Sequence, residues 1–90
     1  MAILFRQFGV SDKLPSKIEI EKPQATAKEI LEIVHETTGE NVFEIVSTSS
    51  GIREEYVLLK NGSNIFLDKG WHTMAKSGDV LTILVLTVGG

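Results

Sequence analysis

The chain has 90 residues, of which 42 % are apolar and 23 % charged, and its net charge is −3. This length and composition fit one soluble globular domain and exclude an intrinsically disordered chain. The dispersed nine Lys and Arg argue against a nucleic-acid partner, and the lack of cysteine excludes a disulfide scaffold or a cysteine nucleophile.

Two strands are predicted near the start of the chain. Residues 2–8 are apolar and partly β-branched or aromatic, which predicts a strand that Gly9 ends. Residues 16–21 alternate apolar and charged side chains, as a half-buried strand does. The turn-forming residues between the two segments indicate a hairpin, and Pro23 ends the second strand.

A helix is predicted over residues 26–38. Thr26 and Glu29 stand at capping-box spacing, where each side chain can bind the other residue's free backbone N–H. Gly39 is a suitable residue for the end of the helix. The apolar residues recur at helical period on one face, which comprises Ala27, Ile30, Leu31, Val34 and Thr38.

The middle of the chain predicts a second hairpin. Residues 42–51 begin with apolar side chains that require burial and end in a Ser- and Thr-rich loop. Residues 55–60 read as a strand, and the following Asn61-Gly62 is a strong hairpin signal. Residues 64–67 are expected to form the return strand.

The last part of the chain predicts a buried strand. Residues 70–77 are expected to be a linking segment in which Trp71 and Met74 fill core space. Gly78-Asp79 is expected to turn the chain into residues 80–86, which are almost continuously apolar. Such a run is typical of a central strand covered on one face and partly on the other.

This order of elements predicts an α+β roll in which one helix packs on a mixed sheet. We expect the first and last strands to be parallel neighbours, because the chain between them passes through the helix. The predicted core consists of Ile3, Phe5, Ile18, Ile20, Ile30, Leu31, Val34, Val57, Leu59, Leu81 and Ile83.

The end of the sequence resembles a known family. Gly78-Asp79, an apolar strand and a final Val88-Gly89-Gly90 are similar to the sulfur carriers of molybdopterin and thiamine synthesis, and to the small archaeal-type ubiquitin-like modifiers. Residues 56–62 also resemble the hairpin strand of that family. The resemblance implies a ubiquitin-like β-grasp roll with four to five strands and one main helix. It implies a domain over residues 1–87 and a flexible Gly-Gly tail over 88–90. Val85-Leu86 stands where molybdopterin carriers commonly have two prolines, so the pathway stays open.

The resemblance also implies the site. The carboxylate of Gly90 would be adenylated by an E1-like enzyme, which uses the ATP, and then converted to a thiocarboxylate. Gly89 would let the tail enter a narrow channel, since glycine has no Cβ. If Leu81 and Ile83 face the core, the outward row beside the tail is either a docking surface or covered by the chain itself. The expected partner-binding residues are Gly89, Val88, Thr87, Leu86, Leu84 and Thr82.

Three functions remain open at this point: a sulfur carrier, a protein modifier joined through Gly90 to lysines, and a non-covalent interaction module. An enzyme is not expected, because no nucleophile–base pair or metal cluster stands out. We expect no bound cofactor or metal and a monomer when alone. The expected partners are the activating enzyme and a large synthase subunit or target proteins. No apolar run reaches the roughly 18 residues that span a bilayer, so we expect no membrane partner and a cytoplasmic location.

Overall fold

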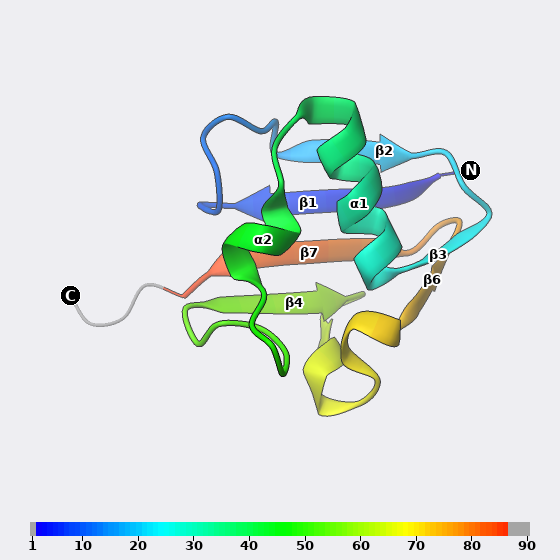
Figure 1. Ribbon diagram of the computed structural model, residues 1–90. Coiled ribbons are helices and arrows are strands. Elements are labelled where there is room, and N and C mark those ends of the chain that lie inside the picture. Colours follow the sequence, from blue (N-terminus) through cyan, green and yellow to red (C-terminus); the bar gives the residue numbers. More distant parts are fainter. Residues whose placement is uncertain (1, 87–90) are drawn as a thin grey trace.

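The computed structural model describes residues 2–86, and a mixed sheet of five strands forms its main layer (Figure 1). The elements are, in chain order, β1 (Ile3–Phe8), β2 (Lys17–Ile20), β3 (Gln24–Thr26), α1 (Ala27–Thr38), α2 (Val42–Val46), β4 (Tyr56–Lys60), β5 (Ser63–Asn64), 3-10 helices at Ile65–Leu67 and Gly70–His72, β6 (Met74–Lys76) and β7 (Val80–Val85). The strand order β2-β1-β7-β4-β5 puts β7 at the centre. β7 runs parallel to β1 and antiparallel to β4. The predicted β-grasp topology is confirmed.

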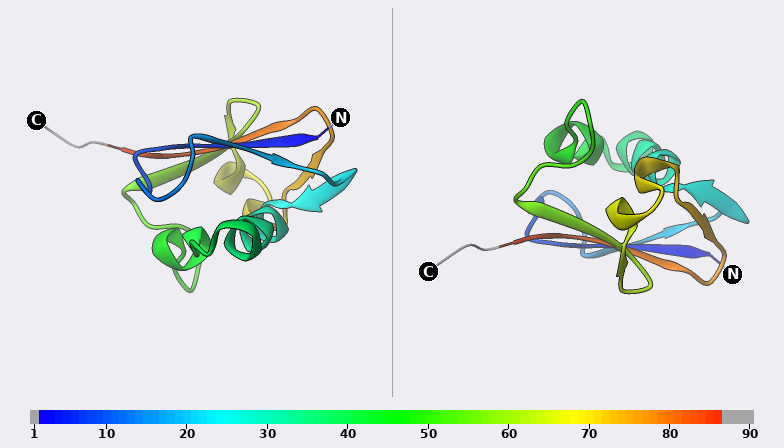
Figure 2. Two further views of the ribbon diagram at one scale, coloured as in Figure 1. Left: turned by 90° about the horizontal axis from the view of Figure 1, so that it is seen from above. Right: turned by 90° about the horizontal axis from the view of Figure 1, so that it is seen from below.

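Helix α1 begins and ends where the sequence indicated. The Thr26 hydroxyl accepts a hydrogen bond from the Glu29 N–H at 3.1 Å, and the Glu29 carboxylate accepts one from the Thr26 N–H at 2.8 Å. Gly39 follows the helix with a φ of 83°, a conformation that glycine adopts without strain. Figure 2 shows α1 and α2 on the same side of the sheet. These two helices therefore cover only one face of the sheet.

The hydrophobic core lies between that sheet face and the helices. Ile3, Phe5, Leu81 and Ile83 are completely buried, as predicted, and so are the inward residues Ile30, Leu31 and Val34 of α1. Ile20 is also buried, whereas Ile18 is half-buried at the edge of the core.

The prediction for the faces of β4 is wrong. Leu58 is the buried residue of this strand, and Val57 and Leu59 are only half-buried. Leu58 stands opposite the buried Ile83 of β7, and residues directly opposite each other share a face of the sheet. Val57 and Leu59 therefore lie on the face that the helices leave uncovered.

Three connecting segments also differ from the predictions. Val42–Val46 is a short helix that buries its first and last residues. The return strand after Asn61-Gly62 has two residues and then becomes a 3-10 helix, because the Asn64 side chain accepts from the Phe66 N–H at 2.9 Å. The predicted linker 70–77 contains β6, which pairs with β3 in a separate two-stranded sheet. Met74 on β6 is 40 % exposed, so it does not fill the core.

The Asn61-Gly62 turn is tied to the start of β7. Both residues have positive φ, at 51° and 87°, as the predicted tight hairpin requires. The Asn61 side chain donates to Asp79 Oδ1 at 3.0 Å and accepts from the Val80 N–H at 2.9 Å. The second Asp79 oxygen accepts from the Lys76 N–H at 2.8 Å. These bonds fix the two turns that flank the central strand.

The same contacts predict how stability depends on pH. The Asn61 amide and the Lys76 N–H lower the pKa of Asp79, because both donate to its ionised form. A lowered pKa adds stability above the ordinary carboxyl pKa of about 4, and this stability disappears as pH falls through the folded-state value. We expect Asp79→Asn to unfold at lower temperature than the wild type near neutral pH. The gap should close in acid, as thermal midpoints measured across pH would show. A gap that stays constant in acid would contradict this prediction.

Candidate functional site: the open face of the sheet

The central strand β7 places the predicted partner-binding residues on the sheet face opposite the helices. Leu81 and Ile83 are fully buried, so the alternating residues Thr82 and Leu84 point to the other side. Both are half-buried by their neighbours on that side. Figure 2 shows the two helices on the far side of the sheet from this surface. We call the face without helices the open face.

Neighbouring strands extend the open face beyond the residues that the sequence analysis named. In β1, Arg6 and Phe8 stand beside Thr82 and Leu84 in the parallel register, and Leu4 stands beside Val80. From β4, Leu59 and Val57 lie opposite Thr82 and Leu84. Phe8 is 46 % exposed, which is unusual for so large an apolar side chain in a strand. The open face is therefore a mostly apolar surface that three strands build together.

Sequence reasoning missed the residues from β1 and β4. The inward residues Ile3 and Phe5 of β1 were predicted correctly, but its outward residues were not named as site residues. In residues 56–60 three successive positions are apolar, so periodicity alone does not tell which side of β4 faces the helices. The register with β7 supplies that information. The family resemblance, which implies that Leu81 and Ile83 face the core, was enough only for Thr82 and Leu84 themselves.

Leu86 continues from the end of β7, at the edge of the open face. It is 45 % exposed, and its N–H donates to the carbonyl of Glu55 at 2.6 Å. One residue beyond the end of β7, the chain is thus held to the residue that precedes β4. Thr87, Val88, Gly89 and Gly90, which include the predicted reacting residue, lie outside the described residues. Their roles and the domain boundary at residue 87 stay predictions.

The loop between β1 and β2 lies beside the end of β7. Gly9 has a φ of 75°, and a Cβ there would stand 2.7 Å from a methyl carbon of Val85. Gln7, which is buried, holds this loop: its amide nitrogen donates to the carbonyls of Ser11 at 3.0 Å and Leu14 at 3.1 Å. Its amide oxygen accepts from the Val10 N–H at 3.1 Å. The loop is therefore fixed where the chain leaves the sheet.

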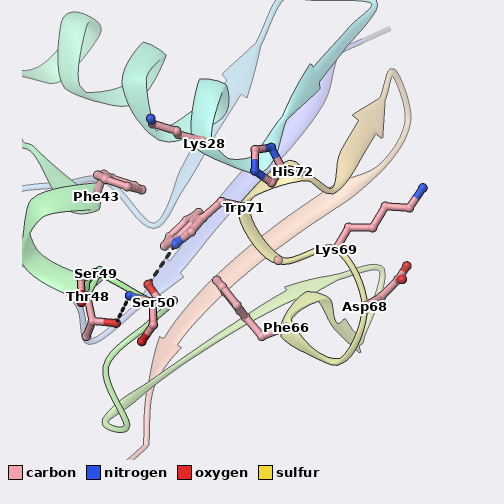
Figure 3. A pocket seen from close by; sticks show the side chains of 12 residues that line it. Lys28, Phe43, Thr48, Ser49, Ser50, Phe66, Asp68, Lys69, Trp71 and His72 are labelled. Atoms are coloured by element: carbon pink, nitrogen blue, oxygen red, sulfur yellow. Dashed lines mark hydrogen bonds between the residues drawn. The ribbon is translucent and has the colours of Figure 1, made fainter.

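A pocket lies on the helix side of the molecule. This surface pocket of about 490 Å³ is centred on Trp71 (Figure 3). The indole ring makes edge-to-face contacts with Phe43 at 4.8 Å and Phe66 at 5.2 Å between ring centroids. Its N–H donates to the Gly51 carbonyl at 2.9 Å. Trp71 packs against the core, as predicted, and fixes the loop that follows α2.

Within residues 2–86, no three His, Asp or Glu side chains are grouped as metal ligands. No helix in this part is long and apolar enough to cross a membrane. The chemistry that the open face offers is the binding of another apolar surface.

No protein-family model matches the sequence, and no curated protein shows significant sequence similarity to it. Solved structures do match. A chain of the Amycolatopsis orientalis BexX/CysO complex aligns over 99 % of this chain and 100 % of its own, with a TM-score of 0.80 and 19 % identity. SAMP1 from Haloferax volcanii aligns over 100 % of both chains, with a TM-score of 0.72 and 15 % identity. Urm1 from Trypanosoma brucei aligns over 99 % of this chain and 95 % of its own, with a TM-score of 0.64 and 12 % identity. The protein therefore has the ubiquitin-like β-grasp fold that its sequence resemblance implied.

Proposed function

We propose that this protein is a small sulfur carrier whose Gly90 carboxylate is adenylated by an E1-like enzyme and converted to a thiocarboxylate. The observation that carries the proposal is the position of β7. This central strand contributes Thr82 and Leu84 to an uncovered apolar face, and the chain leads from its end toward Gly89-Gly90. A docked partner would thus lie beside the segment that carries the tail. Adenylation consumes ATP, so we place the reaction in the cytoplasm.

The chemistry follows from the inertness of a carboxylate. The Gly90 carboxylate, encoded as the end or exposed by cleavage, attacks the α-phosphorus of ATP and releases pyrophosphate. A persulfide on a partner protein then displaces AMP and forms an acyl disulfide. A thiol cleaves the S–S bond, which leaves the thiocarboxylate on Gly90 and a disulfide on the partner side. This chain supplies the carboxylate and needs no cysteine of its own for any step.

The two glycines serve the passage of the tail into the enzyme. Without a Cβ, Gly89 tolerates backbone conformations that other residues resist and lets the chain approach the nucleotide closely. The open face supplies binding energy away from the reacting carboxylate. Such remote binding can hold a flexible reactant in place for a reaction, which lowers its entropic cost.

Protein modification is the second candidate function. A lysine amine of a target protein would attack the same acyl-adenylate, and an isopeptide bond would replace the thiocarboxylate. One of the similar structures described above, SAMP1 from Haloferax volcanii, is a small archaeal modifier protein by name. This likeness supports keeping the modifier beside the carrier. Both functions begin with the same activation step.

The docking role of the open face can be tested with two leucines. Leu84 belongs to the open face, whereas Leu67 is 86 % exposed in a 3-10 helix outside it. We expect Leu84→Ser to raise the KM for this protein about tenfold in ATP–pyrophosphate exchange with its cognate adenylating enzyme, since buried interface residues carry most binding energy. Leu67→Ser is the matched control and should leave the KM unchanged. Equal KM values for the two variants would contradict docking through the open face.

A further inference from the structure

Arg6 occupies the middle of the open face with a donor that has no acceptor. It stands in β1 between Thr82 of β7 and Lys17 of β2 in the sheet register. Its Nε atom is buried, and among residues 2–86 no group accepts a hydrogen bond from it. The guanidinium carbon lies 5.0 Å from the centre of the Phe8 ring. A cation is therefore held within an apolar surface by its own neighbours.

This arrangement is unfavourable for the isolated protein. A buried donor without an acceptor has lost its hydrogen bonds to water without replacement. Lys17 lies directly opposite Arg6 in the antiparallel pair, and like charges in that position repel. The nearest carboxylate in the strand register is that of Glu19. Glu19 stands opposite Leu4, two residues along β2 from Lys17. The Nε donor is enclosed by the chain itself, so an acidic group from outside the chain would bind the outer end of the guanidinium, where it would offset the repulsion between Arg6 and Lys17.

We propose that Arg6 is the charged contact for an acidic side chain of the E1-like enzyme that docks on the open face. This inference rests on the proposed function and adds the chemistry of the partner surface: an apolar patch with a carboxylate opposite Arg6. Arginine suits this role, because its planar fork can bind both oxygens of a carboxylate. The surrounding Phe8 and Leu84 exclude water on docking, which strengthens the pair.

The inference is tested by the KM for this protein in ATP–pyrophosphate exchange with the cognate adenylating enzyme. Arg6→Met replaces the aliphatic stem of arginine with another unbranched apolar chain and removes the guanidinium. We expect it to raise the KM about tenfold or more, with kcat unchanged, because truncating a desolvated charge pair weakens the complex. Arg6→Lys keeps the charge without the fork and should give a smaller increase. Lys28→Met is the control, because Lys28 is an exposed cation on α1, on the helix side of the sheet.

Two further readouts separate this role from a structural one. The KM of the wild type should rise with ionic strength more steeply than that of Arg6→Met, since a charge pair has been removed. The guanidinium N–H resonances of Arg6 should shift in the wild type when the enzyme is added, as expected for a new hydrogen bond. Arg6→Lys also serves as the folded variant should Arg6→Met unfold.

The outcomes distinguish this inference from the proposed function. A wild type that is activated while Arg6→Met keeps the same KM and salt dependence would overturn the role of Arg6 alone. A wild type that supports no exchange with its cognate enzyme would overturn the proposed function, and the inference with it. An equal increase in KM for Lys28→Met would also overturn the role of Arg6, because any lost cation would then have the same effect.

Discussion

Deletion of Gly90 is expected to abolish ATP–pyrophosphate exchange with the cognate adenylating enzyme and to leave folding unchanged. The deletion moves the carboxylate back by one residue, out of reach of the α-phosphorus of ATP. The core described above is built from residues between Ile3 and Ile83, so the thermal midpoint should stay the same. The expected loss is complete, which makes this the largest effect that the proposed function predicts.

Gly89→Ala provides a graded comparison with the deletion. It keeps the carboxylate in position and adds one Cβ, so acyl transfer should slow without being lost. Full activity of the Gly90 deletion would contradict the carrier and the modifier alike. The non-covalent interaction module would then be the better account of the protein.

Ile83→Ala, at a core position of β7, is expected to be strongly destabilising. Ile83 is fully buried in the central strand, opposite the buried Leu58 of β4. Removing its side chain should cost about 2–5 kcal/mol, because both the burial of apolar atoms and the local packing are lost. This is a large share of the about 5–15 kcal/mol that stabilises a typical domain. Urea unfolding monitored by circular dichroism measures the change.

The neighbouring leucines of β4 give a matched pair for the same measurement. Leu58→Ala should also cost about 2–5 kcal/mol, because Leu58 is completely buried. Leu59→Ala should cost about 1 kcal/mol or less, since Leu59 is half-buried on the open face. Similar costs for the two variants would contradict the assignment of the faces of β4.

Local patterns in the sequence were sufficient for the elements whose signals are short-range. The capping residues Thr26 and Glu29 predicted where α1 begins, and Asn61-Gly62 predicted the tight hairpin turn. The strict alternation of residues 17–20 predicted the edge strand β2. In each case the determining contacts lie within a few residues of one another. The parallel pairing of β1 and β7 followed from the intervening helix.

Elements that depend on distant contacts were not predictable in the same way. The run Val57-Leu58-Leu59 is apolar at every position, so the side that faces the core is decided by its pairing with β7. β3 and β6 each have three residues and exist because they pair with each other across about fifty residues of sequence. The 3-10 helix after β5 depends on one Asn64 side-chain hydrogen bond that competes with strand pairing.

The residues of the candidate site also differ in whether the sequence alone could predict them. The family resemblance implied that Leu81 and Ile83 face the core and that Thr82 and Leu84 point outward, and the structure has this orientation. Arg6 and Phe8 join them only through the register of two strands that are more than seventy residues apart in sequence. The Gly-Gly sequence of the tail indicates only that its backbone has wide conformational freedom, and it does not identify a binding partner. The role of Gly90 stays a prediction, because residues 87–90 lie outside the described part of the chain.

The most direct test of the central claim is the intact mass of this protein isolated from its native cells without reducing or alkylating treatment. The carrier account predicts a population in which one oxygen is replaced by sulfur, and fragmentation should place that sulfur on Gly90. Gly-Gly remnants on lysines of other proteins, with no sulfur-containing form, would instead indicate the modifier. An unmodified carboxylate on every molecule, together with no such remnants, would contradict both accounts.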